Sequence, residues 1–95
     1  MSYKYATDGG LLVATTATTA EQTGMKPGAT YEFTCTATCV ARWGADDASA
    51  ADGGFDFAVP TGAVVRSVCP TGDTAINIIR VAADGNCLIS RVDSA

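Results

Sequence analysis

The sequence contains no histidine and few basic residues, and both absences narrow the functions open to it. Histidine is the side chain that most often acts as a general base near neutral pH, and it is a common zinc ligand, so its absence argues against acid-base catalysis and a zinc site. The six Lys and Arg residues are scattered, and ten Asp and Glu residues give a net charge of −4. A negative chain without a basic cluster repels phosphate backbones, so we expect no nucleic-acid partner.

Long apolar runs are also missing. No segment approaches the roughly 20 apolar residues that a membrane-spanning helix needs, and the first eight residues lack the basic start and apolar stretch of a secretory signal. We therefore expect a protein that is made in the cytoplasm and has no membrane partner. With 95 residues the chain is long enough for one small core and too short for two, so we expect a single domain over residues 1–95.

Alternation between apolar and polar residues is the strongest pattern that is present. Over residues 31–43 the odd positions are apolar or small and nearly every even position is polar. Side chains of a strand alternate between the two faces of a sheet, so this run predicts one long strand with a buried face. The predicted core comprises inward residues of this strand and two later isoleucines: Tyr31, Phe33, Cys35, Cys39, Trp43, Ile76 and Ile78.

Turn signals built from Gly, Pro and Asp divide the rest of the chain into short segments rich in Val, Ile, Thr and Ala. Two hairpins are predicted, one around the D-G-G turn at residues 8–10 and one over residues 75–92. The fold class expected is all-β, a single-domain β-sandwich or jelly-roll-like barrel of about seven to eight antiparallel strands. The predicted strands occupy residues 3–7, 11–20, 31–43, 55–59, 63–69, 75–82 and 87–92.

Four cysteines are the first candidates for chemistry. On one strand the Cα atoms of Cys35 and Cys39 would be about 13 Å apart, beyond the ~7 Å limit for a disulfide, so these two cannot pair with each other. A bridge from either of them to Cys69 or Cys87 stays open, although synthesis in the cytoplasm favours free core thiols. The spacing of the cysteines also lacks the close pairs of a zinc site. Because burial makes a thiol inert, we expect no cysteine nucleophile and no enzymatic activity.

An acidic, irregular segment at residues 44–54 is the second candidate. It is rich in Ala, Asp and Gly and has no periodic pattern, which indicates an exposed loop. The spacing of its aspartates does not match the alternating ligands of an EF-hand, so we expect a solvated loop and no metal or other cofactor. We expect Asp46, Asp47 and Asp52 to contribute to an interface with another protein.

The N-terminal residues 1–7 are the third candidate. Tyr3 and Tyr5 stand at alternate positions, which favours an extended segment. One interpretation is an N-terminal arm that pairs with a neighbouring molecule and contributes both tyrosines to an interface. The competing interpretation is an ordinary edge strand in the subunit's own sheet.

The order of motifs over residues 31–92 resembles the small all-β virion proteins of tailed bacteriophages. The shared traits are a long alternating strand that ends in R-W-G, an Ala/Asp/Gly-rich loop, a V-P step, a valine-rich strand, a P-T-G-D turn and an isoleucine-rich strand. R-W-G occupies residues 42–44, and the V-P step ends the segment 57–60. The valine-rich strand covers residues 64–68, the P-T-G-D turn residues 70–73 and the isoleucine-rich strand residues 76–82.

This resemblance implies a non-enzymatic structural protein of the virion that decorates or stabilises the capsid, like head-decoration or cement proteins. The implied partner is the major capsid protein or another virion protein. A homo-oligomer, with a trimer favoured, would bury apolar residues that one small sandwich leaves exposed.

A different class of function is a carbohydrate- or receptor-binding β-sandwich module of a phage tail. Sugar sites present exposed aromatic faces beside polar groups, and Trp43 next to Arg42, Asp46 and Asp47 would supply such a set. The alternation over residues 31–43 instead places Trp43 on the buried face. A regulatory protein that binds one host enzyme is a third alternative.

Overall fold

The computed structural model describes residues 10–92. The regular secondary structure in that part of the chain consists of β-strands alone. The expected all-β class is confirmed, with eight strands in two four-stranded antiparallel sheets. The strands are β1 (Gly10–Thr15), β2 (Ala20–Thr23), β3 (Thr30–Cys35), β4 (Cys39–Trp43), β5 (Phe57–Val59), β6 (Val64–Val68), β7 (Ala75–Arg80) and β8 (Gly85–Arg91).

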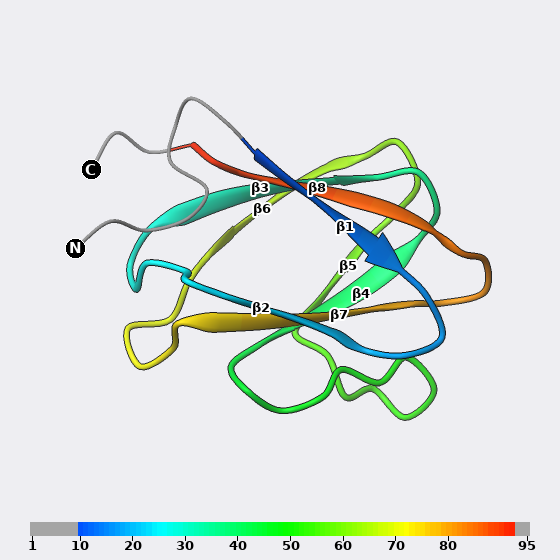
Figure 1. Ribbon diagram of the computed structural model, residues 1–95, viewed down its shortest axis with the longest axis horizontal. Helices are drawn as coiled ribbons and strands as arrows, with labels where there is room; N and C mark the ends of the chain where they lie inside the picture. The colour runs from blue at the N-terminus through cyan, green and yellow to red at the C-terminus, as the bar shows by residue number, and fades with distance from the viewer. Residues whose placement is uncertain (1–9, 93–95) are drawn as a thin grey trace.

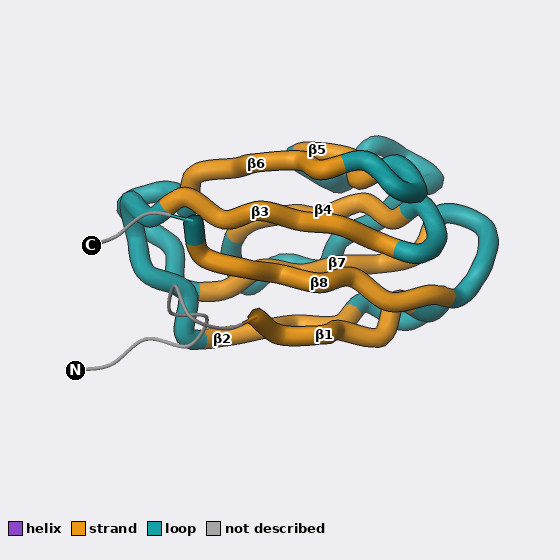
Figure 2. The backbone as a smooth tube through the Cα atoms, turned by 90° about the horizontal axis from the view of Figure 1, so that it is seen from above, coloured by secondary structure: helices purple, strands orange, loops and turns teal. Residues whose placement is uncertain are grey.

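Sheet A has the strand order β1-β8-β3-β6, and sheet B has the order β2-β7-β4-β5. The sheets stack face to face (Figures 1 and 2). The first strand pairs with the last, the second with the seventh, the third with the sixth and the fourth with the fifth. This pairing is the strand arrangement of a jelly roll. Strands β1, β6, β2 and β5 remain sheet edges, so the domain is an open sandwich and not a closed barrel.

The alternating run over residues 31–43 is two strands, and the prediction of one strand is wrong. β3 lies in sheet A and β4 in sheet B, with a corner at residues 36–38. Thr36 Oγ1 accepts a 2.9 Å hydrogen bond from the backbone N–H of Asn86, and a Cβ added to Gly85 would lie only 2.8 Å from the same oxygen. The alternation continues through the corner because both strands turn their odd positions into one shared core.

The hairpin predicted over residues 75–92 fails for a similar reason. Strands β7 and β8, predicted as a hairpin over residues 75–92, lie in different sheets. The predicted strand over residues 11–20 is divided between β1 in sheet A and β2 in sheet B. The first arm of the other predicted hairpin, residues 3–7, lies outside the described residues, and β1 pairs with β8. Consecutive strands change sheet at every connection except the one from β4 to β5.

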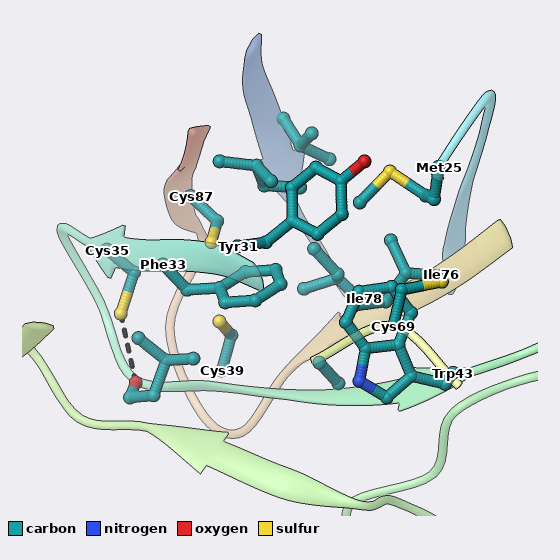
Figure 3. Packing of buried hydrophobic residues seen from close by; sticks show 14 of the residues in the cluster. Met25, Tyr31, Phe33, Cys35, Cys39, Trp43, Cys69, Ile76, Ile78 and Cys87 are labelled. Atoms are coloured by element: carbon teal, nitrogen blue, oxygen red, sulfur yellow. Dashed lines mark hydrogen bonds between the residues drawn. The ribbon is translucent and has the colours of Figure 1, made fainter. Parts of the chain in front are cut away.

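The core fills the space between the two sheets, and all seven residues predicted for it lie there, none more than 7% exposed. Figure 3 shows the aromatic rings packed together at its centre. The Phe33 ring lies 5.0 Å from that of Phe57 and 6.1 Å from that of Trp43, measured between centroids. The indole N–H of Trp43, on sheet B, donates a 2.9 Å hydrogen bond to Ser67 Oγ on sheet A. This bond satisfies the one polar atom of the indole and links the two sheets.

Candidate interaction surface

All four cysteines are free thiols buried in the core. Burial raises the pKa of Cys35 and, with the nearby charge of Asp73, the pKa of Cys69, in both cases to about 11. A hydrogen bond with the Cys87 thiol, followed by burial, holds the pKa of Cys39 far above its usual range. Thiolates are the reactive form of cysteine, and the raised pKa values of Cys35, Cys39 and Cys69 disfavour that form, so these enclosed thiols act as packing groups.

The described chain offers no enclosed site for a small ligand. Among residues 10–92 no group of three or more Cys, Asp or Glu side chains is placed to hold a metal ion, and no pocket is found. No helix in this range is long and apolar enough to span a membrane. The features that distinguish one part of this surface from another are therefore exposed apolar side chains and charges.

The outer face of sheet A carries most of the exposed large apolar side chains. Six such side chains occur among residues 10–92, and five of them, between 38% and 64% exposed, project from sheet A or its immediate extension. They are Leu12, Val64, Val68, Leu88 and Val92. No described loop crosses this side of the sheet, which faces the viewer in Figure 2. We call this outer surface of sheet A the apolar face.

Strand register arranges the apolar face in rows that run across the sheet. Leu12 lies opposite Leu88, Leu88 opposite Thr34, and Thr34 opposite Val64, so one row crosses all four strands. A second row is formed in the same way by Gly10, Ser90, Glu32 and Arg66. A third row joins Val92, Thr30 and Val68 through a 3.0 Å hydrogen bond from the Val92 N–H to the Thr30 carbonyl and the pairing of Thr30 with Val68.

Only two charged side chains lie on the apolar face among the described residues, and they neutralise each other. Arg66 Nε donates a 3.0 Å hydrogen bond to Glu32 Oε2 on the neighbouring strand. Both groups retain contact with water, Arg66 more than Glu32, so the pair adds little to stability. The apolar face as a whole carries no net charge.

The outer face of sheet B is partly covered by its own chain. Val40 and Asn77 point away from the core, yet they are only 3% and 1% exposed. The loop that follows β4 lies against this side of the sheet, below it in Figure 1. Asn77 Nδ2 donates a 3.0 Å hydrogen bond to the Gly44 carbonyl, and Asn77 Oδ1 accepts one of 3.3 Å from Thr19 Oγ1. The same Thr19 oxygen accepts a bond from the N–H of the buried Ala48, so the loop is tied to the sheet.

The residues predicted for an interface do not lie on the apolar face. Asp46, Asp47 and Asp52 are exposed on the loop that covers sheet B, on the opposite side of the sandwich. Tyr3 and Tyr5 lie outside the described residues. We call residues 44–54 the acidic loop. The acidic loop and the apolar face are therefore two separate surfaces.

Local contacts hold part of this acidic loop. Arg42 Nη2 lies 3.6 Å from the carboxylate of Asp46, and Arg42 Nη1 donates a 3.3 Å hydrogen bond to the Asp47 carbonyl. A hydrogen bond with the Ser49 side chain, chiefly, lowers the pKa of Asp52. All three carboxylates face solvent.

Trp43 does not supply the aromatic surface that a sugar site needs. Its side chain is in the core, with ring centroids of Tyr31 and Phe57 at 6.0 and 6.4 Å. Its neighbour Arg42 is engaged with the acidic loop. The set of residues considered for carbohydrate binding is therefore divided between the core and the surface.

Sequence reasoning missed the apolar face, although a signal for it exists. Leu11, Leu12 and Val13 are apolar in succession, and so are Val64 and Val65, which means that both faces of β1 and β6 carry apolar side chains. A half-buried strand alternates apolar with polar residues, so a break in alternation marks a second apolar face. The signal does not say whether the chain itself covers that face.

The strand pairing and the two contrasting faces define a jelly-roll β-sandwich that presents surfaces and no cleft among its described residues. Comparison with known proteins finds no matching family model, no matching curated protein and no matching solved structure.

Proposed function

We propose that this chain is a non-enzymatic structural protein of a tailed-bacteriophage virion, where it decorates or stabilises the capsid. The observation that carries this proposal is the jelly-roll strand order, an arrangement found in viral capsid proteins and lectins. The resemblance of residues 31–92 to small phage virion proteins supports the same class. Because one fold serves several functions, the surfaces provide the second part of the support.

The described surface suits binding to other proteins. Among residues 10–92 the exposed positions are occupied largely by Ala, Thr, Gly and Val, whose short side chains lose little conformational entropy when a partner covers them. The apolar face and the acidic loop lie on opposite sides of the sandwich. A protein with two opposed contact surfaces is able to hold two neighbours together, which is what a stabilising capsid protein does.

The partner is the major capsid protein or another virion protein, and the acidic loop is the surface that contacts it. Asp46, Asp47 and Asp52 present acidic side chains on a loop that is tied to the sheet beneath it. A pre-organised loop loses less entropy on binding than a free one. A basic region on the partner would complement these charges and speed association.

The direct test is the composition of phage particles from the bacterial culture whose DNA encodes the chain. Particles are purified on a density gradient, and peptides of this chain and of the most abundant particle protein are quantified by mass spectrometry. We expect the chain in the particle band at a constant ratio to the capsid protein, with an abundant bacterial enzyme as the negative control. Finding the chain only in the soluble fraction would refute the proposal.

The acidic loop is tested by adding purified chain to particles that lack it. The variant that combines Asp46→Asn with Asp47→Asn should cosediment at least about tenfold more weakly than the unmodified chain if the loop meets a basic region. The control combines Glu21→Gln with Asp84→Asn, which removes the same charge at exposed positions outside the loop. Equal binding of both variants would exclude the acidic loop as the contact.

A further inference from the structure

We propose that the apolar face binds a second copy of this chain, which packs on it about a two-fold axis that runs parallel to the strands between β3 and β8. This inference goes beyond the proposed function, because self-association needs no capsid and can be measured on the purified chain. Three properties of the apolar face support it: its exposed apolar side chains, its charge and its register.

Exposed apolar area is the driving force. Five large apolar side chains lie on one sheet face, in two rows on either side of the row that holds Glu32 and Arg66, and no described loop covers them. Monomeric proteins rarely expose contiguous apolar patches larger than a few hundred Å². Removing these side chains from water favours association. They are valines and leucines, which lose little conformational entropy when they are covered.

The charge distribution favours a second copy as the occupant. The chain carries a net charge of −4, so two copies repel each other in most orientations. The apolar face is neutral because Glu32 and Arg66 pair on it. A dimer joined through this face keeps the acidic loops on its two outermost sides, where the separation between like charges is largest.

The rows of the apolar face are complementary to themselves. A two-fold axis parallel to the strands between β3 and β8 reverses the strand order, so β6 of one copy lies over β1 of the other and β3 lies over β8. In the first row Val64 then faces Leu12 of the second copy, and Leu88 faces Thr34. In the second row Arg66, the longest side chain of the face, lies over Gly10, which has no side chain to oppose it.

The size of the apolar face sets the expected strength. Four strands about 4.8 Å apart and three rows about 6.7 Å apart span about 19 by 20 Å, or about 800 Å² for both copies in projection. The relief of the side chains brings the buried accessible area close to the ~1,000 Å² at which specific interfaces begin. We therefore expect a reversible dimer that dissociates on dilution. A two-fold dimer is favoured over the trimer expected from the resemblance, because the rows match themselves only in pairs.

The first experiment measures the mass of the full chain by sedimentation equilibrium from low micromolar to millimolar concentration. We expect a monomer-dimer equilibrium, and we expect Leu12→Lys and Leu88→Lys each to weaken it by at least about tenfold, since each places a charge in the interface. The control is Val81→Lys, which changes an exposed valine on the turn after β7, outside the apolar face. Because all three side chains are exposed, circular dichroism should show folded protein in each case.

A chain that stays monomeric up to millimolar concentration would overturn the proposal, whether residues 1–9 or nothing at all covers the apolar face. A dimer that Leu12→Lys and Leu88→Lys weaken no more than Val81→Lys does would also overturn the proposal, since the contact would then lie elsewhere. A trimer would also overturn it, because the two-fold register would not hold.

The second experiment tests the register by crosslinking. Leu12 and Val64 lie on opposite edge strands of sheet A, about 14 Å apart in one copy, which is too far for a disulfide. Across the proposed axis they face each other. The chain with both Leu12→Cys and Val64→Cys, treated with oxidised glutathione, should therefore form a covalent dimer, with release of reduced glutathione.

Each single variant is the control for this crosslink, because neither cysteine would face its own counterpart. The unmodified chain is the control for the buried thiols. Crosslinking by either single variant to the same extent as the double variant, or no crosslink in a protein that sediments as a dimer, would reject the proposed register.

Discussion

The two sheets have the same number of strands and share one core, yet their outer faces differ. On sheet B, the outward residues Val40 and Asn77 are buried, and the loop after β4 lies against this side of the sheet and bonds to Asn77. On sheet A, outward residues such as Leu12 and Leu88 stay exposed. In both sheets the alternation of side chains decides which residues enter the core. Whether an outward residue meets water depends on what the chain, or a partner, lays over it.

A lysine placed on each outer face in turn should give the largest difference between the two sheets. Val40→Lys puts an ammonium group at a buried outward position of sheet B and should destabilise the fold by about 4 kcal/mol, because the charge loses its hydration there. Leu12→Lys, on the exposed face, should change the free energy of unfolding by less than about 0.5 kcal/mol. Urea unfolding followed by Trp43 fluorescence measures both.

If Val40→Lys fails to fold, Val40→Thr provides the milder comparison. It buries a hydroxyl of nearly the same volume as the lost methyl group and should destabilise by about 1 to 2 kcal/mol. Equal effects of lysine at positions 12 and 40 would mean that the loop does not cover sheet B in solution.

Alkaline pH tests the interior on the side of sheet A. Cys35 ends β3 and Cys69 follows β6, and burial raises the pKa of both to about 11. The unfolded chain loses these protons first, so the contribution of both thiols to stability is complete below about pH 9 and falls as the pH rises towards 11. Urea midpoints across this range should decrease.

Tyrosine and lysine titrate in the same range, so a variant has to isolate the thiols. Combining Cys35→Ala with Cys69→Ala should flatten the decrease between about pH 9 and 11, even though the variant is less stable at neutral pH. An unchanged slope in this variant would show that other groups cause the loss.

A smaller effect is expected from the amide that ties the loop to sheet B. Asn77→Ala removes the amide that donates to the Gly44 carbonyl and accepts from the Thr19 hydroxyl, and it should destabilise the fold by about 2 kcal/mol. Thr34→Ala, at an outward position of sheet A, should have an effect below about 0.5 kcal/mol. Thermal unfolding compares the two variants. If Asn77→Ala leaves the stability unchanged, the Asn77 amide does not hold the loop on sheet B.

The smallest effect is expected from the carboxylates of the same loop. Combining Asp46→Ala with Asp47→Ala should change stability by less than about 0.5 kcal/mol, since an exposed ion pair at 3.6 Å contributes little. The loop remains tied to the sheet through backbone groups at Gly44 and Ala48. Loss of the folded state in this variant, seen by circular dichroism, would show that the carboxylates are structural.

The core was predictable because its pattern is local. Phe33 and Ile78 are apolar at alternating positions of short segments, and such positions enter a core in any sheet arrangement. The corner at residues 36–38 was not predictable, because Thr36 and Thr38 continue the alternation without glycine or proline. Its contacts come from distant residues, Asn86 and Thr61.

The candidate interface was predicted only in part. The exposed aspartates of residues 44–54 follow from composition, but the burial of Ala48 in the same segment depends on Thr19, far away in the chain. The apolar face depends on register. Leu12 and Val64 are 52 positions apart in the sequence, and only the pairing of β1, β8, β3 and β6 brings them into one row.

By itself the sequence determined the all-β class, the identity of the core residues and the absence of a histidine-based site, because alternation and composition act through neighbouring residues. The tertiary structure decided which strands share a sheet, which outward residues the chain covers and where an apolar face stays open. Those outcomes depend on contacts between segments far apart in the chain, and a pattern with a period of two residues carries no information about them.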